Sequence, residues 1–362
     1  MNNFFVTLEH VGESDWINFE DFTETLTEEI VEFLDTHSPD EVKITFSYTS
    51  ESSLYLIDNK WFLEKIHLFA DRYKIPYKNI TFRSSNVLIE ETYNKWHKLY
   101  SSTDQKINTE YESFGFWLYG KNKRYYDTLK FTKEAPTNLR IKKFNCLNAN
   151  MLLHRKKFCS KLFEEGLCNT DENLISVHEY FTHDFPYPEK MKPLLPIQFD
   201  LTGSWEEIYK QIFKKDTDSS DWNKTGDYRY IYENTYFTVT TESCMCPSLA
   251  DYHPDHTINN YLKTFYRDMF ITEKTTRPIL NLHPQIIYST SGTLEHLKSL
   301  GYKTFSDYWD ESYDSVDDNE EKLNRIMAVV KELSNKPLEE LHEMYFDMMP
   351  ILKNNQEILI NQ

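Results

Sequence analysis

The chain has 362 residues, a formal net charge of −18, and 40% hydrophobic and 15% aromatic residues. This length favours two domains, and this apolar content indicates folded domains rather than a disordered chain. The negative charge, without a long Lys/Arg block, argues against a general binder of duplex DNA. No apolar run approaches the ~18 residues of a membrane span, and the N-terminus lacks a secretory signal, so we expect a cytoplasmic protein.

Glycine is scarce, with 8 residues in the whole chain. The glycine-rich dinucleotide fingerprint and the P-loop are both absent, so a phosphate site would have to use helix ends and basic side chains. The five cysteines, an odd number without disulfide-like spacing, indicate reduced thiols. Cys244 and Cys246 lack the second pair that a zinc site needs, so no metal site is predicted there.

The N-terminal third alternates short apolar runs with amphipathic stretches. The predicted strands are 4–8, 42–47, 79–82 and 114–118, and the predicted helices are 20–34, 56–73 and 87–100. Strands that alternate with helices are typical of βαβ units and a parallel sheet. We therefore predict one small α/β domain over residues 1–135, which ends in a connector around Pro136.

A second α/β domain is predicted over residues 136–335. It begins with a strand at 141–147, a turn that contains Asn148 and Asn150, and a helix at 155–166 that ends at a glycine. A further strand at 237–239 leads to Glu242. The polar segment that follows contains His253, Asp255 and His256, which could form a metal trio but fit an irregular loop better.

The most strongly punctuated stretch runs from Tyr266 to Gly301. Thr272 is placed to cap a helix that runs to about Leu282 and ends at His283-Pro284. The β-branched run 285–289 predicts a buried strand, and a helix that ends at Gly301 follows.

The C-terminal part is acidic and largely helical. We predict a short strand at 304–305 and helices at 319–333 and 337–360. The last helix, within 336–362, is a candidate to cross back onto the first domain. The acidic aromatic turn 308–314 suits either sugar binding or packing against the sheet.

Two predicted helix starts carry basic residues. Thr272, Glu273 and Lys274 begin one helix, where free N–H groups, the helix dipole and a lysine charge together suit a diphosphate. Glu273 could accept hydrogen bonds from sugar or ribose hydroxyls, or it could be an ordinary solvated first-turn residue. Arg155 begins the other helix and could hold a phosphate bidentately, or it could belong to a solvated basic face.

These blocks resemble a known family. Phe237 to Ser243 (Phe-Thr-Val-Thr-Thr-Glu-Ser) and then Phe270 to Lys274 (Phe-Ile-Thr-Glu-Lys) look like the donor-site signature of the α1,3-fucosyltransferases, although the gap is longer and Thr-Glu-Ser replaces Glu-Asn-Ser. Phe144 to Asn150, followed by His154-Arg155, is similar to the strand, turn and arginine of that family. The similarity spans about residues 140–305, and uncharacterised virus-encoded glycosyltransferase-like proteins carry similar blocks.

The resemblance implies a GT-B fold, in which two Rossmann-like α/β domains face a cleft. It implies an inverting transfer from a nucleoside diphosphate sugar, with a GDP-sugar favoured, to a hydroxyl of a glycan or other acceptor. The implied donor-binding residues are Asn148, Asn150, Arg155, Glu242, Thr272, Glu273 and Lys274. No further cofactor or metal is required, because basic side chains would neutralise the diphosphate.

The general base is less clear from the sequence. Glu9 and His10 end the first predicted strand and are the candidates, although both could be ordinary surface residues. Two alternatives remain open: a non-catalytic carbohydrate-binding or assembly module with the same fold, and a phage-type glucosyltransferase that acts on DNA bases, which the negative charge disfavours. The sugar, the acceptor and the oligomeric state are not readable from the sequence.

Overall fold

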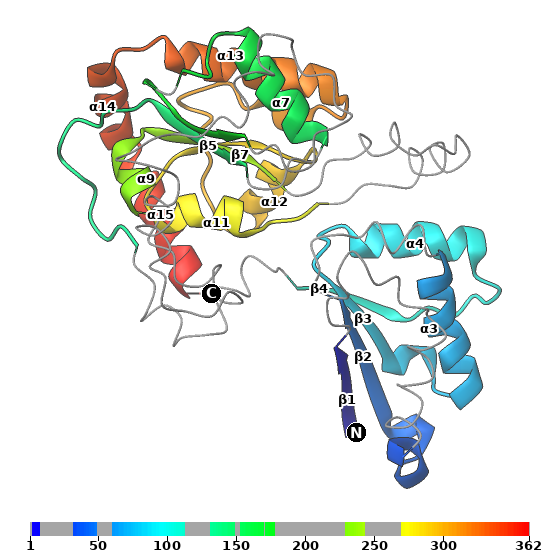
Figure 1. The fold of residues 1–362 in the computed structure, drawn as a ribbon. Helices are drawn as coiled ribbons and strands as arrows, with labels where there is room; N and C mark the ends of the chain where they lie inside the picture. Colours follow the sequence, from blue (N-terminus) through cyan, green and yellow to red (C-terminus); the bar gives the residue numbers. More distant parts are fainter. Residues whose placement is uncertain are drawn as a thin grey trace. The chain divides into compact units, whose positions relative to one another are not determined.

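The computed structural model describes residues 2–7, 32–48, 60–112, 131–148, 153–169, 171–177, 229–242 and 269–361. The chain divides into two compact units (Figure 1). Unit 1 comprises residues 1–114 and 260–270, and unit 2 comprises residues 115–259 and 271–362. Each unit contains a four-stranded parallel sheet, so the predicted α/β class is confirmed.

Unit 1 has the strand order β1-β2-β3-β4. Its strands are β1 (Asn2–Thr7), β2 (Val42–Tyr48), β3 (Ile80–Ser84) and β4 (Asn108–Tyr111). In the described part of unit 1 the helices given with both ends are α3 (Lys60–Tyr73) and α4 (Ile89–Tyr100), with short 3-10 turns at Pro39–Glu41 and Tyr77–Asn79. Residues 32–36 are helical as well. The strands predicted at 4–8, 42–47 and 79–82 are confirmed.

Alternation along β2 and β3 sorts side chains onto two faces. Ile44, Phe46 and Phe82 are buried in one core with residues of α3 and α4, whereas Lys43 and Arg83 point to the other face. Successive strand residues face opposite sides, so this pattern is the expected one for a sheet with one apolar face.

One strand of unit 1 was not predicted. β4 has the sequence Asn-Thr-Glu-Tyr, without an apolar run, and it pairs as an edge strand with β3. An ion pair between Arg83 Nη2 and Glu110 Oε2 (2.8 Å) joins the two strands on the polar face. The strand predicted at 114–118 lies outside the described residues, as does nearly all of the helix predicted at 20–34.

Unit 2 has the strand order β6-β5-β7-β8. Its strands are β5 (Phe144–Asn148), β6 (Leu174–Val177), β7 (Phe237–Thr241) and β8 (Gln285–Tyr288). Its helices are α7 (Leu153–Glu164), α9 (Arg229–Asn234), α11 (Glu273–Leu280), α12 (Thr293–Ser299), α13 (Asn319–Ser334), α14 (Leu338–Asp347) and α15 (Met349–Asn361), with a 3-10 turn at Ser312–Ser315.

The strand order of unit 2 reverses beside β5. The chain passes from β5 to β6 on one side and later returns to place β7 on the other side, and all pairs are parallel. Ligands of open parallel sheets bind beyond the carboxyl ends of the strands at such a switch point. The carboxyl ends of β5 and β7 are therefore the place to look for a site.

Several predictions for unit 2 are confirmed. Two are wrong: the strand at 304–305 and the single helix at 337–360. Thr272 caps α11, β8 is fully buried, and Gly301 takes a left-handed φ of 91° after α12, as predicted. No strand forms at 304–305, because the Phe305 N–H donates to Glu311 Oε1 (2.7 Å) instead of to a strand. β6 and α9 were not predicted.

The helix predicted at 337–360 is two helices, α14 and α15. They separate at Met348, directly before Met349 and Pro350, because proline has no N–H to continue the hydrogen-bond ladder of α14. α15 then packs against α11, and its Gln356 Nε2 donates to Leu280 O (2.6 Å) at the end of α11. The same Nε2 donates to Thr132 O (2.8 Å), in the segment before β5.

The acidic aromatic turn packs inside unit 2. Trp309 is buried and stacks on Phe305 with ring centroids 4.9 Å apart, and Tyr313 is buried as well. Asp314 Oδ1 accepts from Leu294 N (3.0 Å) at the start of α12. These residues therefore serve packing and capping.

Among the described residues, no helix combines the length and apolarity needed to cross a bilayer.

His283 is a buried, neutral histidine at the amino-terminal end of β8. Burial, followed by the nearby Arg140 charge, lowers its pKa to about 3. Thr235 O lies 2.7 Å from its Nε2, and Thr238 Oγ1 lies 2.9 Å from its Nδ1. Since Thr238 Oγ1 also accepts from Asn145 Nδ2 (3.0 Å), it can donate its proton to a neutral Nδ1.

We predict that unit 2 loses stability in mild acid because of His283. Above pH 6.5 the ring is neutral in both states, whereas between pH 6.5 and about 3 only the unfolded chain binds the proton. The free energy of unfolding should therefore fall by up to about 1.4 kcal/mol per pH unit from this group. Urea unfolding at pH 7.5, 6 and 5 would measure it, and His283→Gln should reduce the slope; an unchanged slope would contradict the prediction.

Candidate functional site

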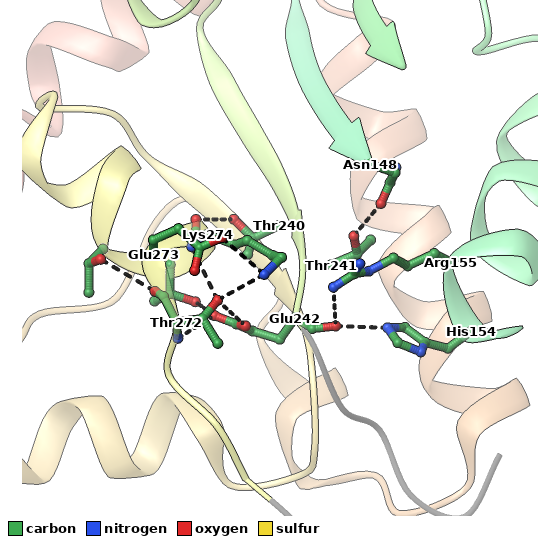
Figure 2. Close-up of polar contacts among 11 residues, drawn as sticks. Asn148, His154, Arg155, Thr240, Thr241, Glu242, Thr272, Glu273 and Lys274 are labelled. Atoms are coloured by element: carbon green, nitrogen blue, oxygen red, sulfur yellow. Dashed lines mark hydrogen bonds and ion pairs between the residues drawn. The ribbon is translucent and has the colours of Figure 1, made fainter. Parts of the chain in front are cut away.

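The candidate site lies where the carboxyl ends of β5 and β7 meet the first turns of α7 and α11 (Figure 2). Six of the predicted donor-binding residues lie there: Asn148, Arg155, Glu242, Thr272, Glu273 and Lys274. The seventh, Asn150, and both base candidates, Glu9 and His10, lie outside the described residues. The structure thus brings together residues that are up to 126 positions apart, from Asn148 to Lys274.

The carboxylate of Glu242 holds the start of α11. Its Oε1 accepts from Thr272 N (3.0 Å) and Thr275 Oγ1 (2.5 Å), and its Oε2 accepts from Thr272 Oγ1 (2.8 Å). The side chain is fully buried, and this burial raises the pKa of Glu242 against the opposing effects of Lys274 and the threonine hydrogen bonds. With both oxygens occupied, Glu242 is a fixed part of the scaffold.

The main-chain carbonyl of Glu242 holds the start of α7. It accepts from His154 Nε2 (2.8 Å) and from Arg155 Nη2 (3.2 Å), and both side chains are buried. Burial, followed by the charge of Arg155, lowers the pKa of His154 to about 3, so the ring is neutral and its proton lies on Nε2. Figure 2 shows Glu242 between the two helix starts.

The side chain of Asn148 forms hydrogen bonds with other side chains of unit 2. Its Oδ1 accepts from Thr241 Oγ1 (2.5 Å), which joins the ends of β5 and β7. Its Nδ2 donates to Cys146 Sγ (3.4 Å) and Cys159 Sγ (3.5 Å). Burial raises the pKa of both thiols, so they are protonated, as expected for reduced cysteines. Asn148 is 1% exposed, so its observed role is to join strand ends.

The first turn of α11 has fewer available N–H groups than the sequence indicated. Thr272 N–H donates to Glu242, and Lys274 N–H donates to Thr272 Oγ1 (3.2 Å) as an N-cap bond. One turn later, Pro278 has no N–H for the Lys274 carbonyl, and Thr240 Oγ1 donates to that carbonyl instead (3.4 Å). With these two N–H groups used, side-chain charges add to the attraction that this helix start keeps for anions.

Lys274 is more accessible than Arg155. Its Nζ donates to Thr272 Oγ1 (3.3 Å) and to Glu273 Oε1 (3.1 Å), and 24% of its side chain is exposed. Arg155, in contrast, is 2% exposed. Lys274 can therefore reach a ligand from its present position, whereas Arg155 contributes positive potential from below the surface.

Arg277 belongs to the same charged group and was not predicted. Burial opposes the ionisation of Glu273, but the charges of Lys274 and Arg277 outweigh it and lower the pKa of Glu273 to about 2. Arg277 follows Glu273 by four residues, the spacing at which a glutamate and an arginine lie on one helix face. That spacing is the sequence signal that would have identified it.

This arrangement suits a phosphate-bearing anion. Arg155 and Lys274 lie in the first turns of α7 and α11, and buried Glu242 joins these two helix starts. Arg277 lies one turn further along α11, in its last turn, and its charge acts on Glu273. Within the described ranges, no group of three or more His, Cys, Asp or Glu side chains is arranged to hold a metal ion. His253, Asp255 and His256 lie outside those ranges.

No protein-family model matches the chain, and no curated protein matches it in sequence. The similarity to the α1,3-fucosyltransferases therefore stays a hypothesis that rests on the motifs quoted above.

We predict that Glu242→Ala lowers the free energy of unfolding by about 3 kcal/mol or more, because buried donors on Thr272 and Thr275 lose a shared acceptor. The matched control is Glu172→Ala, which removes a carboxylate that is 53% exposed and paired with Lys143. The control should change stability by less than about 0.5 kcal/mol. Chemical denaturation measures both, and similar losses in the two variants would contradict the role given to Glu242.

Proposed function

We propose that unit 2 binds a nucleoside diphosphate sugar at the carboxyl ends of β5 and β7 and that the chain is a glycosyltransferase. The observation that carries the proposal is the convergence of Arg155 and Lys274 on the switch point between β5 and β7, with Glu242 bonded to both helix starts. Switch points bind ligands in open parallel sheets, and cations there favour an anionic ligand. The motif similarity favours a GDP-sugar and a glycan hydroxyl as acceptor.

The chemistry would depend on stabilising a leaving diphosphate. An acceptor hydroxyl attacks the anomeric carbon, a new C–O bond forms, and the bond from that carbon to the diphosphate oxygen breaks. The diphosphate leaves with the electron pair. Lys274 and Arg277, both half-buried, would contact it, while buried Arg155 would stabilise its charge through the field. The acceptor proton would pass to a base, for which Glu9 and His10 are the sequence candidates.

The proposal predicts that one nucleoside diphosphate raises the melting temperature of the full chain. At a ligand concentration of 100 times Kd, the native state gains about 2.7 kcal/mol, enough for a shift of several degrees. A thermal-shift screen with GDP, UDP, CMP and dTDP measures this, and we expect the largest shift with GDP. Lys274→Ala and Arg277→Ala should each reduce the shift.

The matched control is Lys331→Ala on α13, which removes an exposed lysine that pairs with Glu165 away from the sheet edge. It should leave the ligand-induced shift unchanged. If none of the four nucleotides raises the melting temperature, the proposal is contradicted. A nucleotide could raise the melting temperature while the protein fails to release that nucleotide from its sugar conjugate in the presence of glycan acceptors. That pair of results would favour the non-catalytic binding module.

A further inference from the structure

The two carboxylates at the site are held in different ways. Glu242 accepts three hydrogen bonds and is fully buried. The Oε1 of Glu273 accepts a hydrogen bond from Lys274 Nζ (3.1 Å). Its Oε2 is buried and has no hydrogen-bond partner in the described part of the chain. An unmatched buried acceptor is unfavourable. Charge attraction therefore holds Glu273 in place, without a complete set of donors.

That attraction comes from the groups that would bind a ligand. Lys274 pairs directly with Glu273, and Arg277 is close enough to favour the ionised carboxylate. Both Glu273 and Lys274 are only partly exposed, at 14% and 24% of their side chains. The carboxylate of Glu273 thus already occupies an anion position beside the lysine that a phosphate would use.

We propose that Glu273 is a built-in competing anion that an incoming phosphate must displace from Lys274. This inference rests on the proposed function and names what limits the affinity of that site for a phosphate. A phosphate that takes this position must offset the loss of the Glu273–Lys274 pair. That cost belongs to the free protein, so Glu273 lowers the affinity for every phosphate that uses Lys274.

The incomplete bonding of Glu273 is consistent with displacement. Its Oε2 would lose no hydrogen bond on leaving, whereas the carboxylate of Glu242 would lose three. A single charge within about 4–6 Å commonly changes an ionic equilibrium by tenfold or more. Removal of the Glu273 charge should therefore change anion affinity by at least about that factor.

The test uses orthophosphate and pyrophosphate as probes, by isothermal titration calorimetry on the full chain. These probes carry no ribose or sugar hydroxyl, so a hydroxyl-accepting role of Glu273 cannot affect the result. Glu273→Gln keeps the shape and should bind orthophosphate at least about tenfold more tightly. Pyrophosphate should gain at least as much, because it carries more negative charge close to the removed carboxylate. Glu273→Gln combined with Lys274→Met should lose the gain.

The matched control is Glu340→Gln. Glu340 also lies in the first turn of a helix and pairs with a lysine, Lys336, but on α14. It should leave both affinities unchanged, and melting temperatures would show that all variants are folded.

Equal or weaker orthophosphate binding by Glu273→Gln, with pyrophosphate bound by the unaltered chain, would overturn the competition and leave the proposed site intact. A gain that persists in the double variant would also overturn it, because the competition would then not act through Lys274. Failure of every protein to bind pyrophosphate would overturn this inference and the proposed function together.

Discussion

The hydrogen bonds of one buried residue, Glu242, determine the geometry at the carboxyl ends of β5 and β7 in unit 2. Its carboxylate accepts from Thr272 and Thr275 at the start of α11, and its carbonyl accepts from His154 and Arg155 at the start of α7. Two helices that follow different strands are thereby fixed against the end of β7. Because buried donors and acceptors are costly to leave unmatched, this arrangement resists rearrangement and keeps Lys274 in a defined place.

The same bonds explain how a glycine-poor chain can present an anion site. Phosphate loops usually expose backbone N–H groups through glycines, but here Thr272 N–H and Lys274 N–H are already used to fix the helix. Side-chain charges therefore supply attraction that these two N–H groups cannot. Glu273 offsets part of that charge, so that the site has a competing carboxylate of its own beside the cation that would bind a ligand.

Local features of this site could be predicted from the sequence, whereas the long-range bonds could not. The cap at Thr272, the buried strand that became β8 and the glycine after α12 each depend on a few neighbouring residues, and all were predicted correctly. The role of Glu242 was not readable, because its partners Thr272 and Thr275 follow it by 30 and 33 residues. β4 was missed because edge pairing to β3, not apolar character, defines it.

The most direct test of the central claim is an NMR titration of the deuterated, ¹⁵N-labelled full chain with pyrophosphate. If the edge formed by β5, β7 and the two helix starts binds diphosphates, the largest amide shifts will fall on Thr272, Glu273 and Lys274, with smaller shifts at His154 and Arg155. The same titration of Glu242→Gln, which keeps the shape but weakens the bonds to Thr272 and Thr275, will then show weaker binding. Saturable shifts confined to other parts of the chain would contradict the account.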